Sequence, residues 1–272
     1  MRRWLSLSLA TLACVLSVAA PAQARPGVPL PPAGAGVTPP PTAPVCYDGV
    51  GCYNYVAGRE WITGTGASVL MTQEDPQINL ADPGDGAHSL QELAVETADK
   101  KQIIEIGWTV DHGLNGDTKP HLFIFHWIDG VGTCYNACGF VQTSHLVTPG
   151  MPVIPGLVGQ YGIAYRGGNW WLTYDGIQFG YFPGSIWADF HSFGLVQAFG
   201  EVVTSVGQSS CTDMGNGRYG NQFGSSWISA LQLTGGRNDQ PWLVFATLPQ
   251  DYRQGLVSPL GFHLGGPGTG SC

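Results

Sequence analysis

The chain has 272 residues, of which 40 are glycine and 20 are proline, and only 11% carry a charge. That charged fraction is roughly half of what soluble domains usually have, while 43% apolar residues are enough to build a sizeable core and exclude global disorder. Acidic residues outnumber basic ones by 19 to 11. Since no basic stripe is available to bind a phosphate backbone, we expect no nucleic acid partner.

The first 24 residues have the pattern of an export signal. Arg2 and Arg3 precede an apolar run over 5–20, and Ala-Gln-Ala at 22–24 matches a small-x-small cleavage site. We therefore expect a secreted protein whose mature chain begins after residue 24. Twin-arginine export and lipidation at Cys14 are weaker alternatives. No other stretch reaches the ~20 apolar residues of a membrane helix, so we expect no membrane contact after signal removal.

The rest of the chain divides into a short linker and one domain. Residues 25–45 are mostly proline, glycine, alanine and threonine, which predicts an extended segment without a core. From residue 46 the composition is that of a globular protein, and one domain over 46–272 is normal for an all-β chain of this length.

Short β-branched and aromatic runs alternate with glycine-rich turns along the domain. This pattern predicts an all-β fold, specifically an antiparallel β-sandwich. The strongest helical pattern, over 89–101, is explained equally well by a pair of strands. The predicted strands cover 103–110, 121–127, 139–144, 170–174, 177–182, 195–206, 228–233 and 242–247.

Seven cysteines are present, and six remain once the signal with Cys14 is removed. An even number in an exported chain predicts disulfides, although six cysteines allow 15 pairings. Close spacing favours Cys46–Cys52 and Cys134–Cys138, which leaves Cys211–Cys272. Because neither the cysteines nor the scattered histidines have a common zinc spacing, we expect no metal.

Two glutamates interrupt apolar strands. Alternation in IIEIGWTV puts Glu105 on the face opposite Ile104, and in LVQAFGEVV it puts Glu201 on the face of Phe199. Burial there would raise the pKa of each carboxyl, and two neighbouring carboxyls can divide acid and base roles. The alternative, which the pattern alone favours, is that both point to solvent from a sheet with one exposed face.

Six aromatic residues lie within thirteen positions. Alternation in WWLTY means that some of these rings face outward. They fit a sandwich core with a surface platform, or a groove that stacks on sugar or proline rings. The six are Trp170, Trp171, Tyr174, Phe179, Tyr181 and Phe182.

Several unusual strings of this sequence are similar to the blocks of the neprosin catalytic domain, in the same order over about 66–233. They are IEIGWTV, GD at 116–117, LFIFHWIDG, GTCYNACGFVQT, GNWWLTY, GYFPGSIW, GEVV and DMGNG. Members of that family are secreted glutamic peptidases with an antiparallel β-sandwich fold, which cleave after proline at acidic pH. The family's catalytic glutamates lie in its E-x-G-W and G-E-V blocks, so the resemblance implies that Glu105 and Glu201 are catalytic.

The resemblance also implies a mechanism and a substrate class. One carboxylate activates a water as general base, while its protonated partner polarises the scissile carbonyl. We expect a proline-directed endopeptidase that acts on peptide or protein substrates and needs no cofactor. A carbohydrate-binding sandwich and a two-carboxylate glycosidase are the alternatives, and the resemblance argues against both.

Weaker assignments concern the substrate. Gln142 in the FVQT block is a candidate for orienting a carbonyl or stabilising an oxyanion, with a plain amide beside a strand as the alternative. Trp170, Trp171 and Tyr174 are candidates for a wall that receives proline.

The sequence departs from the family pattern in three places. AFGE at 198–201 replaces W-G-G-E, GYFP at 180–183 replaces G-Y-W-P, and the loop between Cys134 and Cys138 is one residue shorter. The 25–65 segment is too short for the activation domain of plant members, so we expect a compact secreted form without it.

Overall fold

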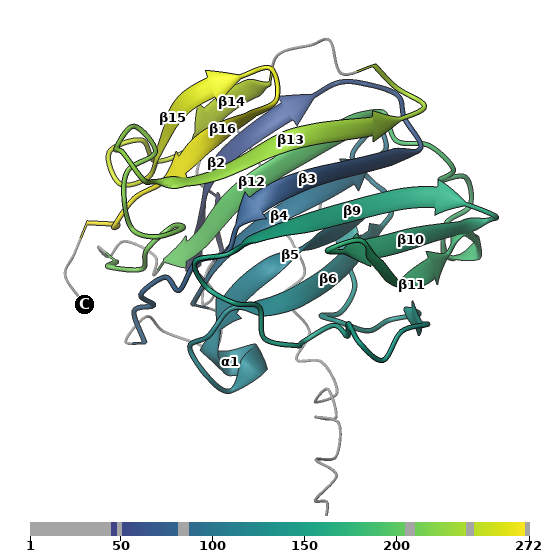
Figure 1. Cartoon of the computed structure of the whole chain (residues 1–272), viewed down its shortest axis with the longest axis horizontal. Coiled ribbons are helices and arrows are strands. Elements are labelled where there is room, and N and C mark those ends of the chain that lie inside the picture. The colour runs from purple at the N-terminus through teal and green to yellow at the C-terminus, as the bar shows by residue number, and fades with distance from the viewer. Residues whose placement is uncertain (1–44, 48–50, 81–86, 205–209, 238–241, 270–272) are drawn as a thin grey trace, which may run out of the picture.

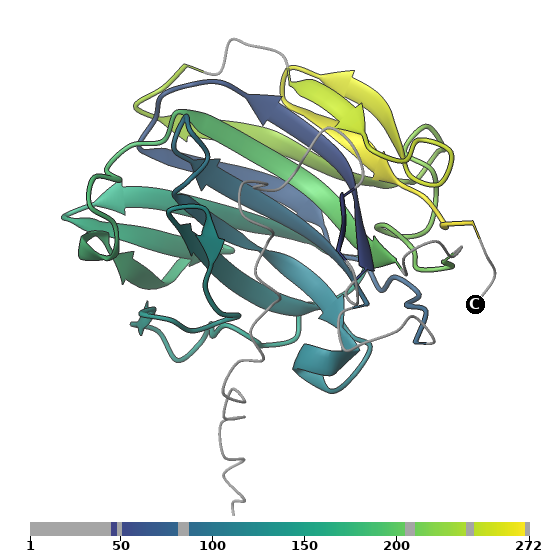
Figure 2. The ribbon, with the colours of Figure 1, turned by 180° about the vertical axis from the view of Figure 1, so that it is seen from behind.

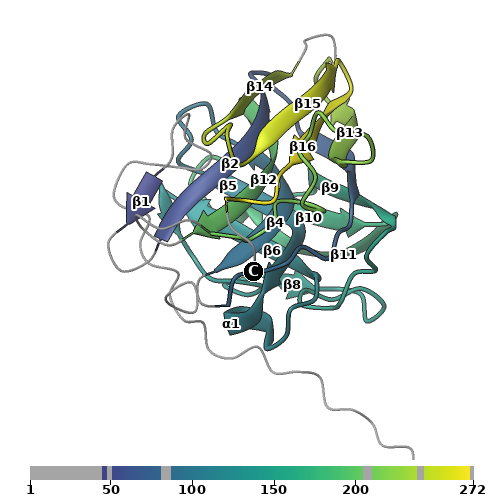
Figure 3. The same ribbon diagram turned by 90° about the vertical axis from the view of Figure 1, so that its left-hand side faces the viewer.

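The computed structural model describes residues 45–47, 51–80, 87–204, 210–237 and 242–269. These residues form an antiparallel β-sandwich, as predicted, with two sheets stacked face to face (Figure 1). Figure 3 shows the molecule side on, with β2 and β6 on one side and β13 and β11 on the other.

The first sheet lies on the side seen in Figure 2. Its central part is assembled from strands that are far apart in the chain, since β12 is inserted between β2 and β4. In order it contains β1 (Val45–Tyr47), β2 (Gly51–Glu60), β12 (Leu195–Thr204), β4 (His88–Glu96), β5 (Ile103–Asp111), β6 (His121–Ile128) and β7 (Val131–Gly132), with β14 (Leu243–Ala246) paired to β2.

The second sheet faces the viewer in Figure 1. In order it contains β15 (Arg253–Ser258), β16 (Gly261–Gly265), β13 (Ser226–Thr234), β3 (Gly66–Thr72), β9 (Val158–Arg166), β10 (Asn169–Tyr174), β11 (Ile177–Pro183) and β8 (Val141–Gln142). A single turn of helix, α1 (His112–Asn115), follows β5, and a 3-10 turn, η1 (Gly184–Ile186), follows β11.

The main core fills the space between the sheets. Alternate residues of β5, such as Ile104, Ile106 and Trp108, meet Trp170 and Leu172 of β10 in this layer. The opposite face of the first sheet carries a second apolar cluster. Its buried members are Tyr55, Ala57, Leu90, Ala94, Ile103, Phe123, Phe125, Trp127 and Phe199.

Because the first sheet is buried on both faces and carries apolar residues on each, its strands lack a clean alternation. The segment 89–101 shows the consequence: Leu90 and Ala94 belong to the outer cluster, whereas Leu93 and Val95 belong to the main core. This spacing resembles a helix, but pairing with β12 and β5 on both sides makes the segment a strand. The helical interpretation was wrong, and the pair of strands is one strand, β4, followed by a turn.

Most of the predicted strands are present, with two kinds of difference. The predicted strand 139–144 is reduced to Val141–Gln142, and residues 205–206 lie outside the described part. The longer strands that the pattern missed are β2, β3, β9, β15 and β16. Strand β2 was missed because it contains glycine, which is unusual in strands. Tight packing requires glycine at position 58, since a Cβ there would lie 2.5 Å from the Phe262 ring.

Two of the predicted disulfides are confirmed. Cys46–Cys52 joins β1 to β2, and Cys134–Cys138 closes the loop that follows β7. Cys211 is disulfide-bonded, but Cys272 lies outside the described residues, so their pairing stays a prediction. The export signal at 1–24 and nearly all of the linker at 25–45 also lie outside them. No helix in the described ranges is long and apolar enough to cross a membrane.

Candidate active site

The outer face of the first sheet carries a row of carboxyl groups on three adjacent strands. Glu201 of β12 lies opposite Leu90 of β4, and Glu105 of β5 lies opposite Ala94 of the same strand. Glu92 stands between Leu90 and Ala94 on that face. It is therefore diagonal to both other glutamates, a relation that corresponds to ~7–8 Å between strand neighbours.

Glu105 is buried and receives one hydrogen bond from a side chain. Trp127 on β6 donates its indole N–H to Oε1 over 2.9 Å. Burial raises the pKa of the Glu105 carboxyl well above 4.5, the charges of Glu201 and Glu96 raise it further, and the Trp127 bond opposes the change. The environment of Glu105 thus favours the protonated form well above the pH at which a free glutamate ionises.

Glu201 has a different environment. The His88 ring places Nε2 at 2.6 Å from Glu201 Oε1, and Tyr55 on β2 lies directly opposite Glu201 in the sheet. Burial raises the pKa of the Tyr55 hydroxyl, and the charge of Glu201 and a hydrogen bond to it raise it further. The Glu201 carboxylate is thus contacted by two polar groups, the His88 ring and the Tyr55 hydroxyl.

Exposure decides between the two sequence interpretations of these glutamates. Glu105 is 5% exposed and Glu201 is 7% exposed. The alternative that both point to solvent is therefore wrong. Among the described residues, Glu60, Glu92 and Glu96 are also buried in strands, so more glutamates than the expected two interrupt apolar strands.

Glu92 was missed as a candidate because its strand resembled a helix. Burial raises its pKa well above 4.5, and the charges of Glu105, Glu201 and Glu96 follow in that order. At the far end of β4, Glu96 accepts a short hydrogen bond from Gln197, whose side-chain oxygen accepts another from Arg59. Burial raises the pKa of Glu96 to about 7, although Gln197 and the nearby cations lower it in part.

The remaining predicted site residues lie elsewhere. Gln142 is exposed on β8, at the edge of the second sheet, where its amide donates to the Ser144 carbonyl over 2.7 Å. Trp170 is in the main core, and its indole donates to the Phe190 carbonyl. Tyr174 also faces that core, whereas Trp171 points away from it. None of these four side chains lies with Glu105 and Glu201.

Aromatic side chains do surround the glutamates, but they come from other strands. Tyr55, Phe123, Phe125, Trp127 and Phe199 form the apolar part of this face. Tyr135, in the Cys134–Cys138 loop, stacks on Phe123 with ring centroids 6.2 Å apart. Alternation within β6 was the signal that could have found Phe123, Phe125 and Trp127.

Gly107 in the E-x-G-W block is required by close packing beside Glu92. A Cβ at this position would lie 2.0 Å from the Gln91 carbonyl oxygen and 2.8 Å from the Glu92 Cα. Gly107→Ala is therefore expected to lower the free energy of unfolding by about 3 kcal/mol or more, measured by chemical denaturation. The control is Gly162→Ala, also in a strand, whose Cβ would meet nothing nearer than 3.4 Å. Equal losses in the two variants would contradict this packing argument.

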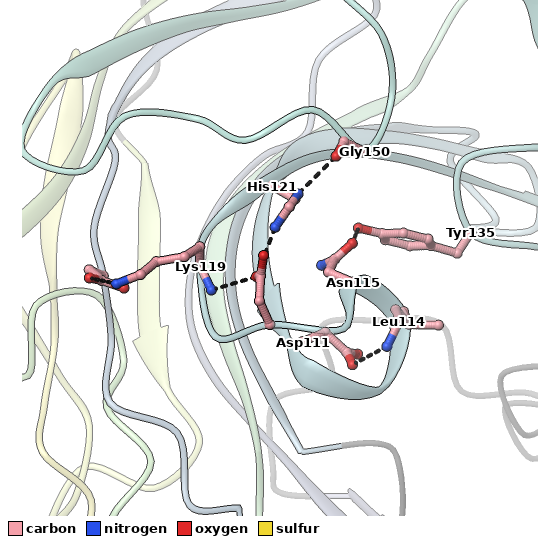
Figure 4. Close-up of polar contacts among 9 residues, drawn as sticks. Asp111, Leu114, Asn115, Lys119, His121, Tyr135 and Gly150 are labelled. Carbon is pink, nitrogen blue, oxygen red and sulfur yellow. Dashed lines mark hydrogen bonds and ion pairs between the residues drawn. The ribbon is translucent and has the colours of Figure 1, made fainter. Parts of the chain in front are cut away.

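A capped turn lies at one end of the row. Asp111 ends β5 and accepts the Leu114 N–H through Oδ1 over 2.9 Å, which caps α1 (Figure 4). Asn115 of this turn accepts a hydrogen bond from the Tyr135 hydroxyl over 3.0 Å. Within the described ranges, no group of three or more His, Cys, Asp or Glu is arranged to hold a metal ion.

The fold and this face define a class of protein, a β-sandwich that buries several titratable carboxyls of the kind used in general acid–base catalysis. A family model described as Neprosin matches residues 85–267. The chain belongs to the neprosin family, which confirms the resemblance and supports a peptidase.

Several solved structures are similar to the chain at low sequence identity. A Scytalido-glutamic peptidase with a peptide-based transition state analog is 9% identical with a TM-score of 0.38, covering 77% of this chain and 97% of that one. The carbohydrate binding module CBM66 from Bacillus subtilis is 11% identical with a TM-score of 0.31, covering 61% and 89%. The agglutinin CG-16 from chicken liver is 10% identical with a TM-score of 0.32, covering 56% and 96%. We draw no functional conclusion from likenesses at these scores.

Proposed function

We propose that the protein is a glutamic endopeptidase that cleaves peptides after proline at acidic pH, with Glu201 as general base and Glu105 as general acid. The observation that carries the proposal is the unequal environment of these two buried carboxyls. Glu201 is in contact with the His88 ring, whereas burial and a neighbouring negative charge raise the pKa of Glu105. Two carboxyls of the same chemical kind can take different roles in a reaction when their environments differ.

The proposed reaction consumes one water and regenerates both carboxyls. Glu201 takes a proton from the water, whose oxygen bonds to the scissile carbonyl carbon, while Glu105 gives its proton to the carbonyl oxygen. The protonated Glu201 then transfers its proton to the amide nitrogen, and the carbon–nitrogen bond breaks. A hydroxyl of the collapsing intermediate returns its proton to Glu105 as the new carboxyl group forms.

Acid pH follows from the requirement for protonated Glu105. Its pKa is raised by burial, so the acid form persists above the pH at which a free glutamate ionises, and activity ends when Glu105 loses its proton. The preference for proline comes from the family resemblance.

Secretion is part of the proposal. Disulfides such as Cys46–Cys52 and Cys134–Cys138 form and persist in oxidising compartments. The expected export signal at 1–24 points to the same location.

The test is cleavage of a proline-containing peptide by the purified protein from pH 3 to 8, with products mapped by mass spectrometry. The matched control peptide has alanine in place of each proline, and a glycan panel is incubated in parallel. Acid-dependent cuts after proline, lost in the alanine peptide, would support the proposal. Sugar release with intact peptides, or no cleavage by folded protein at any pH, would overturn it.

A further inference from the structure

His88 lies between two carboxylates contributed by neighbouring strands. It is paired with Asp111 across β4 and β5. Its Nε2 is 2.6 Å from Glu201 Oε1, and its Nδ1 is 3.8 Å from Asp111 Oδ2. All three side chains are buried, where an ionised group is costly unless an opposite charge lies beside it. The arrangement suits an imidazolium held between two carboxylates.

Asp111 is fixed independently of His88. Its Oδ1 accepts the Leu114 N–H at the start of α1 (Figure 4), an interaction that holds the side chain in place. The other oxygen therefore faces Nδ1 of His88, and at 3.8 Å this contact is electrostatic rather than a hydrogen bond. A partner at one ring nitrogen of a histidine sets what the other nitrogen can donate.

Other titratable groups face the pair from the surrounding strands. Tyr53 on β2 meets the His88 ring edge-on with centroids 6.1 Å apart. Tyr55 on the same strand stays a neutral hydroxyl because burial and the charge of Glu201 raise its pKa. On β4 itself, burial raises the pKa of Glu92, so that its carboxyl is neutral at acid pH. None of these three neighbours is a cation, and His88 is a basic side chain in direct contact with Glu201 in the described part of the chain.

We propose that His88, oriented by Asp111, is a positioning residue that donates a charge-assisted hydrogen bond to Glu201 and keeps this carboxylate ionised as the base. The proposal rests on the proposed function, since it concerns the group that activates water. Glu92, Glu105 and Glu201 share one buried face, and a negative charge can reside on any of them. The cation beside Glu201 decides which one is ionised.

The first test is the pH profile of kcat/KM for His88→Gln. Glutamine keeps an N–H donor near the position of Nε2 but carries no charge. We expect the acid limb to move up by about one pH unit or more, with kcat reduced about tenfold at the wild-type optimum and KM little changed. The control is His121→Gln, because His121 is bonded to the Gly150 carbonyl and Asp117. An unmoved acid limb in His88→Gln, or an equal shift in the control, would overturn the proposal.

A second measurement needs no activity and no variant of His88. The side chain of His88 is titrated by ¹⁵N-detected NMR in the wild-type protein and in Glu201→Gln. Loss of the carboxylate is expected to lower the titration midpoint by about one pH unit or more, and an unchanged midpoint overturns the proposal. If the wild type cleaves no peptide while this midpoint still shifts, the proposed function fails and the ion pair stands.

Discussion

Glu201→Gln is expected to lower kcat/KM for a cleaved peptide by about 10³-fold or more, within the range that general acid–base groups contribute. The amide is the same size as the carboxylate, but it cannot take a proton from water. The rate is measured at the wild-type pH optimum, and circular dichroism checks that the fold is retained. Activity within tenfold of wild type would show that Glu201 is not the base.

Glu105→Gln is expected to be milder and to differ in its pH dependence. Its amide still donates an N–H to the carbonyl oxygen but cannot transfer a proton, so we expect a loss of about 10²-fold. A neutral amide donates at every pH, and the alkaline limb that reports ionisation of Glu105 is expected to disappear. A larger loss than in Glu201→Gln, with the alkaline limb intact, would exchange the two roles.

Glu74→Gln is the matched control for both variants. Burial also raises the pKa of Glu74, and the Ser226 hydroxyl donates to its Oε1 over 2.9 Å. It follows β3 in the second sheet, and we expect its removal to change kcat/KM by less than about twofold. Glu74 is only partly buried, and a loss comparable to that of Glu201→Gln would mean that glutamates withdrawn from solvent are needed for folding rather than for the reaction.

Alternation along single strands predicted a part of the candidate site. The faces of Glu105 and Glu201 follow from period-two patterns that hold whatever the neighbouring strands are. The same logic separates Trp170 from Trp171, and the structure confirms that they face opposite ways. A single strand does not tell which sheet it joins, so the pattern could not show that the WWLTY aromatics belong to the second sheet while Glu105 and Glu201 belong to the first.

The neighbours of the glutamates depend on strand order and register, which the pattern does not contain. β12 and β4 are about 100 residues apart in the chain, and a slip by one residue would move every side chain of β4 to the other face. His88 therefore looked like an isolated histidine, and Glu92 like part of a helix. The two-sided burial of β4 removed the alternation that would have identified both.

The folded protein is expected to be more stable in acid than at neutral pH. Burial raises the pKa of Glu96 from 4.5 to about 7, and it raises those of Glu92 and Glu105 well above 4.5. A raised pKa means that the folded chain holds a proton that the unfolded chain has released. The resulting stability is complete below pH 4.5 and is lost as the pH rises through the folded-state pKa.

Glu96 alone accounts for about 3 kcal/mol of this loss between pH 4.5 and 7. Glu96→Gln removes the titrating group while keeping an oxygen that can accept from Gln197. The free energy of unfolding is measured by denaturation at each pH for the variant and the wild type. Between pH 4.5 and 7, the fall is expected to be about 3 kcal/mol smaller in Glu96→Gln than in the wild type. Parallel curves for the two proteins would contradict the assignment.

His126 acts in the opposite direction. It is buried against the rings of Phe182 and Trp187, and burial lowers its pKa from 6.5 to about 4. A lowered histidine pKa gives stability that is present above pH 6.5 and lost as the pH falls through 4. His126→Phe keeps a ring in the same space, so we expect it to remove this decline, about 3 kcal/mol in all.

The position of the stability maximum therefore tests the mechanism as well as the fold. As the pH rises from 4.5 to 6.5, the stability lost through Glu96 and the stability gained through His126 nearly cancel. Glu92 and Glu105 therefore decide whether the free energy of unfolding rises or falls over this interval. If both hold their protons in the folded state, the maximum lies near pH 4–5, roughly the unfolded-state pKa of a carboxyl. A maximum at neutral pH would mean that these carboxyls ionise in the folded protein. Glu105 would then have no proton to give to a scissile carbonyl in that pH range.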